Sequence, residues 1–117
     1  KMSRNFLSQN DELRKGDYLM SNNRAWKAIF QEDGNFVIYG WKPVWASDTC
    51  GSDVVRLIMQ ADSNLVMYNQ CGTPRWHTNS WQQGSHVCRL QLTDDGKMLV
   101  YKDSKELWSS TNSKGMK

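Results

Sequence analysis

The sequence predicts an all-β fold, a barrel or prism with three-fold pseudosymmetry that is built from three copies of one unit. Two observations predict it: a polar motif that recurs along the chain, and a tryptophan that follows each copy. Apolar and polar residues alternate within the motif, and turn signals such as Asp33-Gly34 and Asp95-Gly96 recur between these segments, which is typical of short strands. No segment shows a sustained helical period, so almost no helix is expected.

The motif reads Q-x-D-x-N-x-V-x-Y and occurs twice with all of its fixed residues. The first copy consists of Gln31, Asp33, Asn35, Val37 and Tyr39, and the second of Gln60, Asp62, Asn64, Val66 and Tyr68. A third, weaker copy keeps only the aspartate and the tyrosine, and consists of Thr93, Asp95, Lys97, Leu99 and Tyr101. Three copies at a spacing of about 30 residues indicate one supersecondary unit repeated around a shared core.

The tryptophans that follow the three copies keep the same period. Trp45, Trp76 and Trp108 are 31 and 32 residues apart. Because successive side chains of a strand point to opposite faces, Phe36 and Ile38 are expected to point inward with these tryptophans. One face of each hairpin then builds the core, and the other face carries the polar motif.

Geometry requires the chain to fold back within each motif. The residues from Gln31 to Tyr39 would span roughly 26 Å in a fully extended strand, at about 3.3 Å per residue. Polar groups spread over that length cannot meet one small ligand. Asp33-Gly34 is a strong hairpin signal. We therefore expect Gln31 to end one strand, Asp33 to occupy the turn, and Asn35 to begin the returning strand.

Composition bounds the classes of function that are possible. A length of 117 residues supports one hydrophobic core, so a single domain over residues 1–117 is expected. The 15 basic and 12 acidic residues are well mixed along the chain, which gives no reason to expect nucleic acid or an anionic membrane surface as a partner. No apolar run approaches the length that spans a bilayer.

The motif side chains predict a site for a hydroxylated ligand. Two amides, a carboxylate and a phenol can all make directional hydrogen bonds. We interpret the chain as a sugar-binding module that requires neither a metal nor another cofactor, and His77 and His86 stand in no zinc-site pattern. An enzyme is not expected, because no serine-histidine-acid set, paired carboxylates or phosphate loop is present.

This pattern resembles the bulb-type (monocot mannose-binding, B-type) lectins, and in particular the members of that family found in fish mucus. The resemblance rests on the repeated motif and on the segments Asn5–Leu7 and Leu13–Leu19, which look like the family's opening strands. It covers nearly the whole chain. It implies a β-prism of three four-stranded sheets around an axis lined by Trp45, Trp76 and Trp108.

The resemblance also implies a role for each motif residue in binding mannose. Asp33 and Asn35 would bind the axial 2-hydroxyl, Gln31 the 3-hydroxyl and Tyr39 the 4-hydroxyl, while Val37 would pack on the ring carbons. The second copy would repeat these roles with Asp62, Asn64, Gln60, Tyr68 and Val66. The third copy is expected to be degenerate, because the Lys97 side chain cannot accept a hydrogen bond and the Thr93 side chain is too short to replace glutamine.

The three cysteines allow at most one disulfide within the chain. Cys50 and Cys71 flank the second repeat, where a disulfide would staple the hairpin, and Cys71–Cys88 is the alternative pairing. By the resemblance, Cys88 would be a buried cysteine on an inward-facing strand. A disulfide would imply an oxidising compartment.

The resemblance implies an extracellular, mucus-type protein of innate defence, although no signal peptide is visible. Its partners would be mannose-containing glycans on glycoproteins or microbial surfaces, bound without membrane insertion. A homodimer is expected, in which the polar segment 109–117 adds a strand to the partner's sheet. The alternative is a lectin-fold protein whose main partner is a protein, such as a cell-surface receptor or an integrin.

Overall fold

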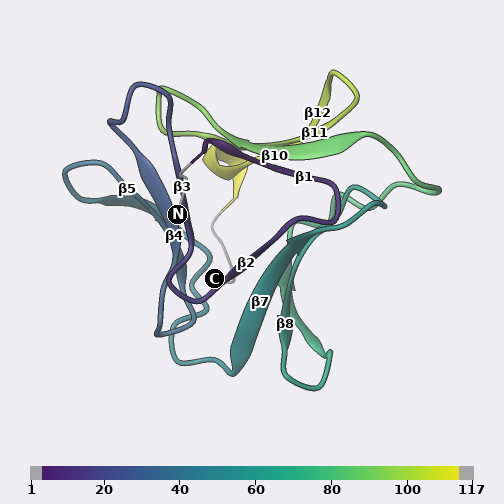
Figure 1. The fold of residues 1–117 in the computed structure, drawn as a ribbon, viewed down its shortest axis with the longest axis horizontal. Helices are drawn as coiled ribbons and strands as arrows, with labels where there is room; N and C mark the ends of the chain where they lie inside the picture. The colour runs from purple at the N-terminus through teal and green to yellow at the C-terminus, as the bar shows by residue number, and fades with distance from the viewer. Residues whose placement is uncertain (1–3, 114–117) are drawn as a thin grey trace.

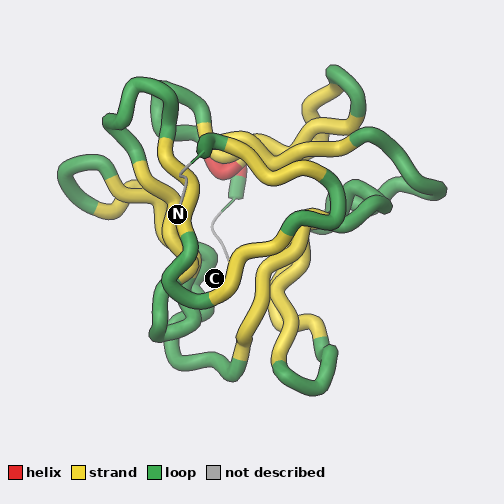
Figure 2. The backbone as a smooth tube through the Cα atoms, viewed as in Figure 1, coloured by secondary structure: helices red, strands yellow, loops and turns green. Residues whose placement is uncertain are grey.

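The computed structural model describes residues 4–113 as three antiparallel sheets of four strands each (Figures 1 and 2). The strands are β1 (Phe6–Ser8), β2 (Glu12–Arg14), β3 (Tyr18–Met20), β4 (Lys27–Phe30), β5 (Phe36–Tyr39), β6 (Pro43–Ala46), β7 (Val54–Met59), β8 (Leu65–Asn69), β9 (Pro74–His77), β10 (Cys88–Leu92), β11 (Met98–Lys102) and β12 (Lys105–Ser109). The predicted β-prism is therefore confirmed. Within the described residues, one short 3-10 helix, η1 (Ser110–Asn112), is present, and no helix there is long or apolar enough to cross a membrane.

Each sheet carries one copy of the motif. Sheet I has the strand order β3-β4-β5-β6 and carries the first copy, sheet II has the order β2-β7-β8-β9 and carries the second, and sheet III has the order β1-β10-β11-β12 and carries the third. Viewed down the short axis, the sheets form the three sides of a triangular prism (Figure 1).

The N-terminal segment ties the three repeats together. Its strands β1, β2 and β3 follow one another along the chain, yet each joins a different sheet (Figure 1). Each of them pairs antiparallel with the first strand of a repeat, as shown by the pairs Phe6–Gln91, Glu12–Ile58 and Tyr18–Ile29. Each repeat supplies three strands of its sheet, so the fourth strand always comes from the N-terminal segment.

The core lies between the three sheets and is built from alternate strand residues. Phe36 and Ile38 of β5 are 0% exposed, which confirms that this face of the hairpin points inward. The equivalent positions of the other two repeats are also fully buried and hold Leu65, Met67, Met98 and Val100. Burying one large apolar side chain contributes about 1.5–3 kcal/mol, so the period-two pattern fixes which face of each strand is inside.

The three repeat tryptophans meet at the centre of this core. Their ring centroids are 5.7 to 6.2 Å apart, and every pair has an edge-to-face arrangement. They hold equivalent registers, since Trp45 lies opposite Ile38, Trp76 opposite Met67 and Trp108 opposite Val100. Such pairs contribute about 0.5–1.5 kcal/mol beyond the burial of their area. The predicted tryptophan-lined axis is confirmed.

Trp45 also holds the end of the described chain. Its Nε1 donates a hydrogen bond of 3.0 Å to the carbonyl oxygen of Ser113, just after η1. Of the segment 109–117 that was expected to exchange between chains, the part up to Ser113 therefore packs against its own chain. Residues 114–117 lie outside the described residues.

The predicted disulfide between Cys50 and Cys71 is wrong. All the cysteines lie within residues 4–113, and none of them forms a disulfide. The chain before β7 turns toward the first motif, where the Cys50 thiol lies 3.4 Å from an Asp33 carboxylate oxygen, whereas Cys71 lies in the exposed β8–β9 turn. Cys88 is buried as expected, and burial raises the pKa of its thiol. The expectation of an oxidising compartment loses this support.

The central position of Trp76 predicts a large loss of stability when its side chain is truncated. Trp76 is 6% exposed and contacts both other axial tryptophans, so Trp76→Ala should lower the free energy of unfolding by about 3–5 kcal/mol. Trp41→Ala is the matched control, because Trp41 is fully exposed, and its effect should be within about 0.5 kcal/mol. Urea unfolding measures both values. Equal losses in the two variants would contradict the axial role.

Candidate functional site

The first motif occupies the β4–β5 hairpin of sheet I. Gln31 follows β4, Asp33 lies in the turn, and Tyr39 ends β5, so the predicted fold-back is confirmed. Gly34 has a φ of +90°, which L side chains rarely adopt, and a Cβ added there would lie 3.2 Å from the carbonyl oxygen of Thr49. Glycine suits this point of the turn, and the second motif makes the same turn with Ser63 at a φ of +74°.

A chain of hydrogen bonds links three side chains of the first motif. The Tyr39 hydroxyl donates to Gln31 Oε1, and Gln31 Nε2 donates to both carboxylate oxygens of Asp33 at 3.0 and 3.1 Å. Asp33 Oδ1 also accepts a bond of 3.0 Å from the backbone N–H of Asn35. The polar groups are thus held in place before any ligand arrives, which lowers the entropic cost of binding.

The amide of Asn35 is oriented by the chain that follows β6. Its Oδ1 accepts hydrogen bonds from Ser47 Oγ at 3.2 Å and from the backbone N–H of Thr49 at 3.1 Å. Because the oxygen is occupied in this way, the amide nitrogen is left to donate, and within residues 4–113 it has no acceptor. Asn35 therefore presents N–H groups beside a carboxylate that accepts.

Ser47 and Thr49 support the motif but are not part of its sequence pattern. The pattern that could have identified Ser47 is a hydroxyl residue two positions after each axial tryptophan, at Ser47, Thr78 and Ser110. In each repeat this hydroxyl accepts from the backbone N–H of the first residue of the returning strand, at 3.0 to 3.2 Å. The serine or threonine thus ties the last strand of the repeat to the motif hairpin.

The second motif repeats this arrangement in sheet II. Gln60 Nε2 donates to the carboxylate oxygens of Asp62 at 3.1 and 3.3 Å, and the Tyr68 hydroxyl donates to Gln60 Oε1. The Asn64 backbone N–H donates to Asp62 Oδ1 at 3.1 Å, and Asn64 Oδ1 accepts from Thr78 Oγ1 at 3.3 Å. The same bonds in two different sheets come from the motif itself rather than from local surroundings.

The valines of both motifs lie beneath the polar groups. Val37 and Val66 are each only 3% exposed, although they stand on the outer face of their strands. Each lies opposite an isoleucine of the preceding strand, Ile29 or Ile58. A ligand therefore has little valine surface to contact, and these residues form the apolar floor of a shallow polar site.

The third motif has a different arrangement. The Asp95 carboxylate accepts from the Thr93 hydroxyl and pairs with Lys97 Nζ at 3.5 Å, and these two groups hold the pKa of Asp95 below its ordinary value. No glutamine links the aspartate to the tyrosine here, and within residues 4–113 the Tyr101 hydroxyl has no hydrogen-bond partner. The bond chain of the first two motifs is therefore not formed.

Hydrogen bonds to Asp33 lower the pKa of its carboxyl group. The backbone N–H of Asn35, followed by the side-chain amide of Gln31, holds the pKa of Asp33 below its ordinary value of 3.8. Because the pKa is lowered by folding, the contribution of these bonds to stability is complete above pH 3.8 and is lost as the pH falls through the lowered value. Within the described residues, no group of three or more metal-binding side chains lies together.

Comparison with known proteins places this chain in a family. No protein-family model matches the chain. The B-type lectin plumieribetin from Scorpaena plumieri is 61% identical over 113 residues, which cover 97% of this chain and 100% of that protein. This chain belongs to the B-type lectin family.

Solved structures agree with this B-type lectin assignment. A monomeric monocot mannose-binding lectin from Gastrodia elata superposes with a TM-score of 0.82 and is 31% identical, covering 93% of this chain and 98% of that one. The mannose-specific agglutinin of snowdrop (Galanthus nivalis), solved with methyl-α-D-mannoside, has a TM-score of 0.78 and is 32% identical, covering 95% and 99%. All three relatives are named as lectins and none as an enzyme.

The hydrogen bonds of the first motif predict how its carboxylate titrates. Gln31→Ala removes one of the donors to Asp33 and should raise the pKa of Asp33 toward 3.8, while the remaining Asn35 N–H keeps it below that value. Titration of the Asp33 side-chain carbon by NMR measures the midpoint. Gln60→Ala, the same change in the second motif, should leave the Asp33 midpoint unaltered. A midpoint of Asp33 that does not respond to Gln31→Ala would contradict the assigned cause.

Proposed function

We propose that this B-type lectin binds mannose-containing glycans through its first two motifs, without a metal ion and without catalysing a reaction. The observation that carries the proposal is the same hydrogen-bonded set of glutamine, aspartate, asparagine and tyrosine side chains in two sheets. The snowdrop structure supports it, because that mannose-specific relative was solved with a mannoside.

The arrangement of donors and acceptors suits the axial 2-hydroxyl of mannose. That hydroxyl donates to the Asp33 carboxylate and accepts from the Asn35 amide, which satisfies both of its hydrogen-bonding capacities. Gln31 binds the 3-hydroxyl and Tyr39 the 4-hydroxyl. The second motif acts in the same way through Asp62, Asn64, Gln60 and Tyr68. A sugar that lacks the axial group leaves the aspartate and asparagine side chains without this bond in the complex, which lowers its affinity.

Because a single site binds weakly, capture of a glycan-bearing surface requires several sites on the same molecule. About four hydrogen bonds at a shallow site correspond to a dissociation constant near the millimolar level, on the order of −4 kcal/mol. Two sites on one chain raise the effective affinity for a surface that displays many glycans, and a homodimer doubles their number. We propose such a homodimer, secreted in mucus-type fluid and directed at glycoproteins or microbial surfaces.

A protein partner remains the second candidate function, and one surface feature favours it. Trp41 in the β5–β6 turn is 106% exposed, and Val44 in the adjoining strand β6 is 52% exposed. Exposed tryptophans are enriched among residues that dominate protein interfaces. Binding to a receptor that survives free mannose and is lost in Trp41→Ala would favour this function over glycan capture.

Single substitutions in the two motifs should each remove one mannose site. Asp33→Ala removes the acceptor of the first site and Asn64→Ala the donor of the second, so each variant should bind half the methyl-α-mannoside that the unchanged chain binds. Isothermal titration calorimetry measures the stoichiometry. Asp95→Ala is the matched control in the third motif and should leave the stoichiometry unchanged.

Ligand controls complete this experiment. Galactose should not compete, because its 4-hydroxyl is inverted and its 2-hydroxyl is equatorial, and glucose should compete poorly for the second reason alone. A chelator should have no effect. Unchanged stoichiometry in both motif variants, or equal competition by galactose, would refute the assignment.

Assembly is predicted to depend on the end of the chain. The full chain should have the mass of a dimer in light scattering, and a chain that ends at Ser113 should be a monomer. The truncation must keep Trp108, since this residue belongs to the axial core, and Ser113, which accepts from Trp45. If the full chain is a monomer at working concentration, exchange of the C-terminal segment between two chains is ruled out.

A further inference from the structure

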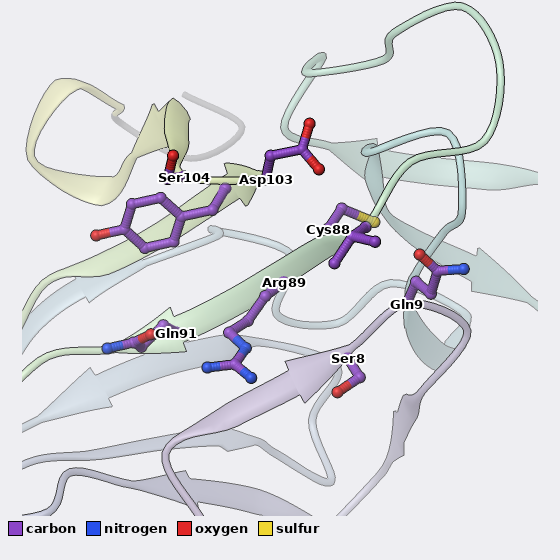
Figure 3. Close-up of a pocket in the computed structure, with 9 residues that line it drawn as sticks. Ser8, Gln9, Cys88, Arg89, Gln91, Asp103 and Ser104 are labelled. Atoms are coloured by element: carbon purple, nitrogen blue, oxygen red, sulfur yellow. The ribbon is translucent and has the colours of Figure 1, made fainter.

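A hollow of about 580 Å³ lies on the outer face of sheet III, beside the third motif (Figure 3). Its lining includes Ser8 at the end of β1, Arg89 and Gln91 of β10, Tyr101 of β11, and Asp103 of the following turn. This volume lies in the range of about 300–1,000 Å³ that is typical of small-ligand pockets. The third motif itself does not explain the hollow, because it shares only Tyr101 with it.

Comparison of the three sheets shows two positions at which this face differs from the other two. Gln91 lies opposite Leu99, the fourth residue of the third motif. The equivalent position is held by Ile29 in sheet I, opposite Val37, and by Ile58 in sheet II, opposite Val66. Ser8 takes the register that Met20 and Arg14 have, so that the smallest of the three side chains faces the hollow. The pseudosymmetric fold thus places polar or small groups here where the other sheets carry larger ones.

Arg89 supplies a positive charge that the fold itself does not neutralise. The equivalent residue of sheet II, Arg56, is paired with Glu12 at 3.1 Å. Sheet III has Phe6 in the register of Glu12, and the Arg89 guanidinium stacks on that ring at 4.4 Å. Within residues 4–113, Arg89 therefore has no carboxylate partner, and the N–H groups of a stacked guanidinium remain able to bind an anion in its plane.

A hydroxyl group and a carboxylate also line the same hollow. The Tyr101 hydroxyl is released because the third motif has Thr93 in place of glutamine. Figure 3 shows the Asp103 carboxylate pointing away from Arg89, on the opposite side of the hollow. A ligand that fits must carry a negative charge at one end and hydroxyl groups at the other.

We propose that this hollow binds an acidic sugar, a monosaccharide unit that carries a carboxylate. Arg89 binds the carboxylate in its guanidinium plane, Gln91 and Tyr101 bind ring hydroxyls, and the Asp103 carboxylate accepts from a further hydroxyl. An inorganic anion does not satisfy the site, because Asp103 offers acceptors that only a ligand with donor groups can use. The site is separate from the two mannose sites and goes beyond the proposed function.

A matched pair of ligands tests the proposal on the full chain. Amide spectra recorded by NMR with methyl-β-D-glucuronide should shift at Ser8, Arg89, Gln91 and Tyr101. Methyl-β-D-glucoside differs only in lacking the carboxylate and should bind about tenfold more weakly or worse, since a hydrogen bond to a charged group is lost. Equal binding of the two, or shifts at the first two motifs instead, would overturn the proposal. The same holds if inorganic sulfate produces the same shifts at the same concentration.

Variants separate this site from the mannose sites. Arg89→Gln removes the charge, and Gln91→Ile introduces the residue that the other two sheets have; both should weaken glucuronide binding about tenfold while methyl-α-mannoside binding is retained. Glucuronide binding that is insensitive to both changes would overturn the proposal. Asp33→Ala combined with Asp62→Ala should abolish mannoside binding and leave glucuronide binding unchanged. The experiment therefore distinguishes an error in the proposed mannose sites from an error in the proposed glucuronide site.

Discussion

The hydrogen bond from a turn N–H to the aspartate carboxylate is the interaction on which the arrangement of the two complete motifs depends. Asp33 accepts from the N–H of Asn35, and Asp62 from that of Asn64, at 3.0 and 3.1 Å. The bond closes the turn and fixes the carboxylate beside the glutamine amide. In the third copy the Thr93 hydroxyl takes over the turn N–H at 3.1 Å, so the hairpin forms without that bond to the aspartate. The hairpin and the motif's chain of hydrogen bonds can therefore separate within one chain.

The inner and outer faces of the sheets are under different constraints. Inside, three tryptophans and the alternate apolar residues fill one shared core, where a change in one repeat disturbs the other two. Outside, each sheet faces solvent alone, so a substitution there has mainly local consequences. This asymmetry explains why the third repeat keeps its core residues Met98 and Val100 while its outer face carries Lys97 and Gln91 instead of the residues of the intact copies.

The parts of the structure set by local periodicity could be predicted from sequence. The strand alternation around Phe36 and Ile38, the turn at Gly34 and the inward-pointing tryptophans follow from spacing, whereas the shared tryptophan-lined axis was implied by the family resemblance. The distribution of β1, β2 and β3 over three sheets depends on long-range register, which no local pattern encodes. The disulfide failed for a related reason: Cys50 is near the second hairpin in sequence but near Asp33 in space. Ser47 was missed because a supporting hydroxyl resembles any strand-end residue until its partner is known.

The prism geometry decides how the proposed sites can act together. The sheets form three sides of a triangle, so motifs on the outer faces of sheets I and II point in different directions (Figure 1). Two such sites on one rigid chain cannot both engage the same mannose unit. They can engage separate glycans, which turns weak single contacts into cross-linking of a decorated surface. A third face with an unneutralised arginine, Arg89, then adds a different chemistry to that contact rather than a third copy of the same one. In this proposal, divergence of one repeat in three broadens what the molecule recognises, whereas divergence in the core would weaken the fold that holds all three.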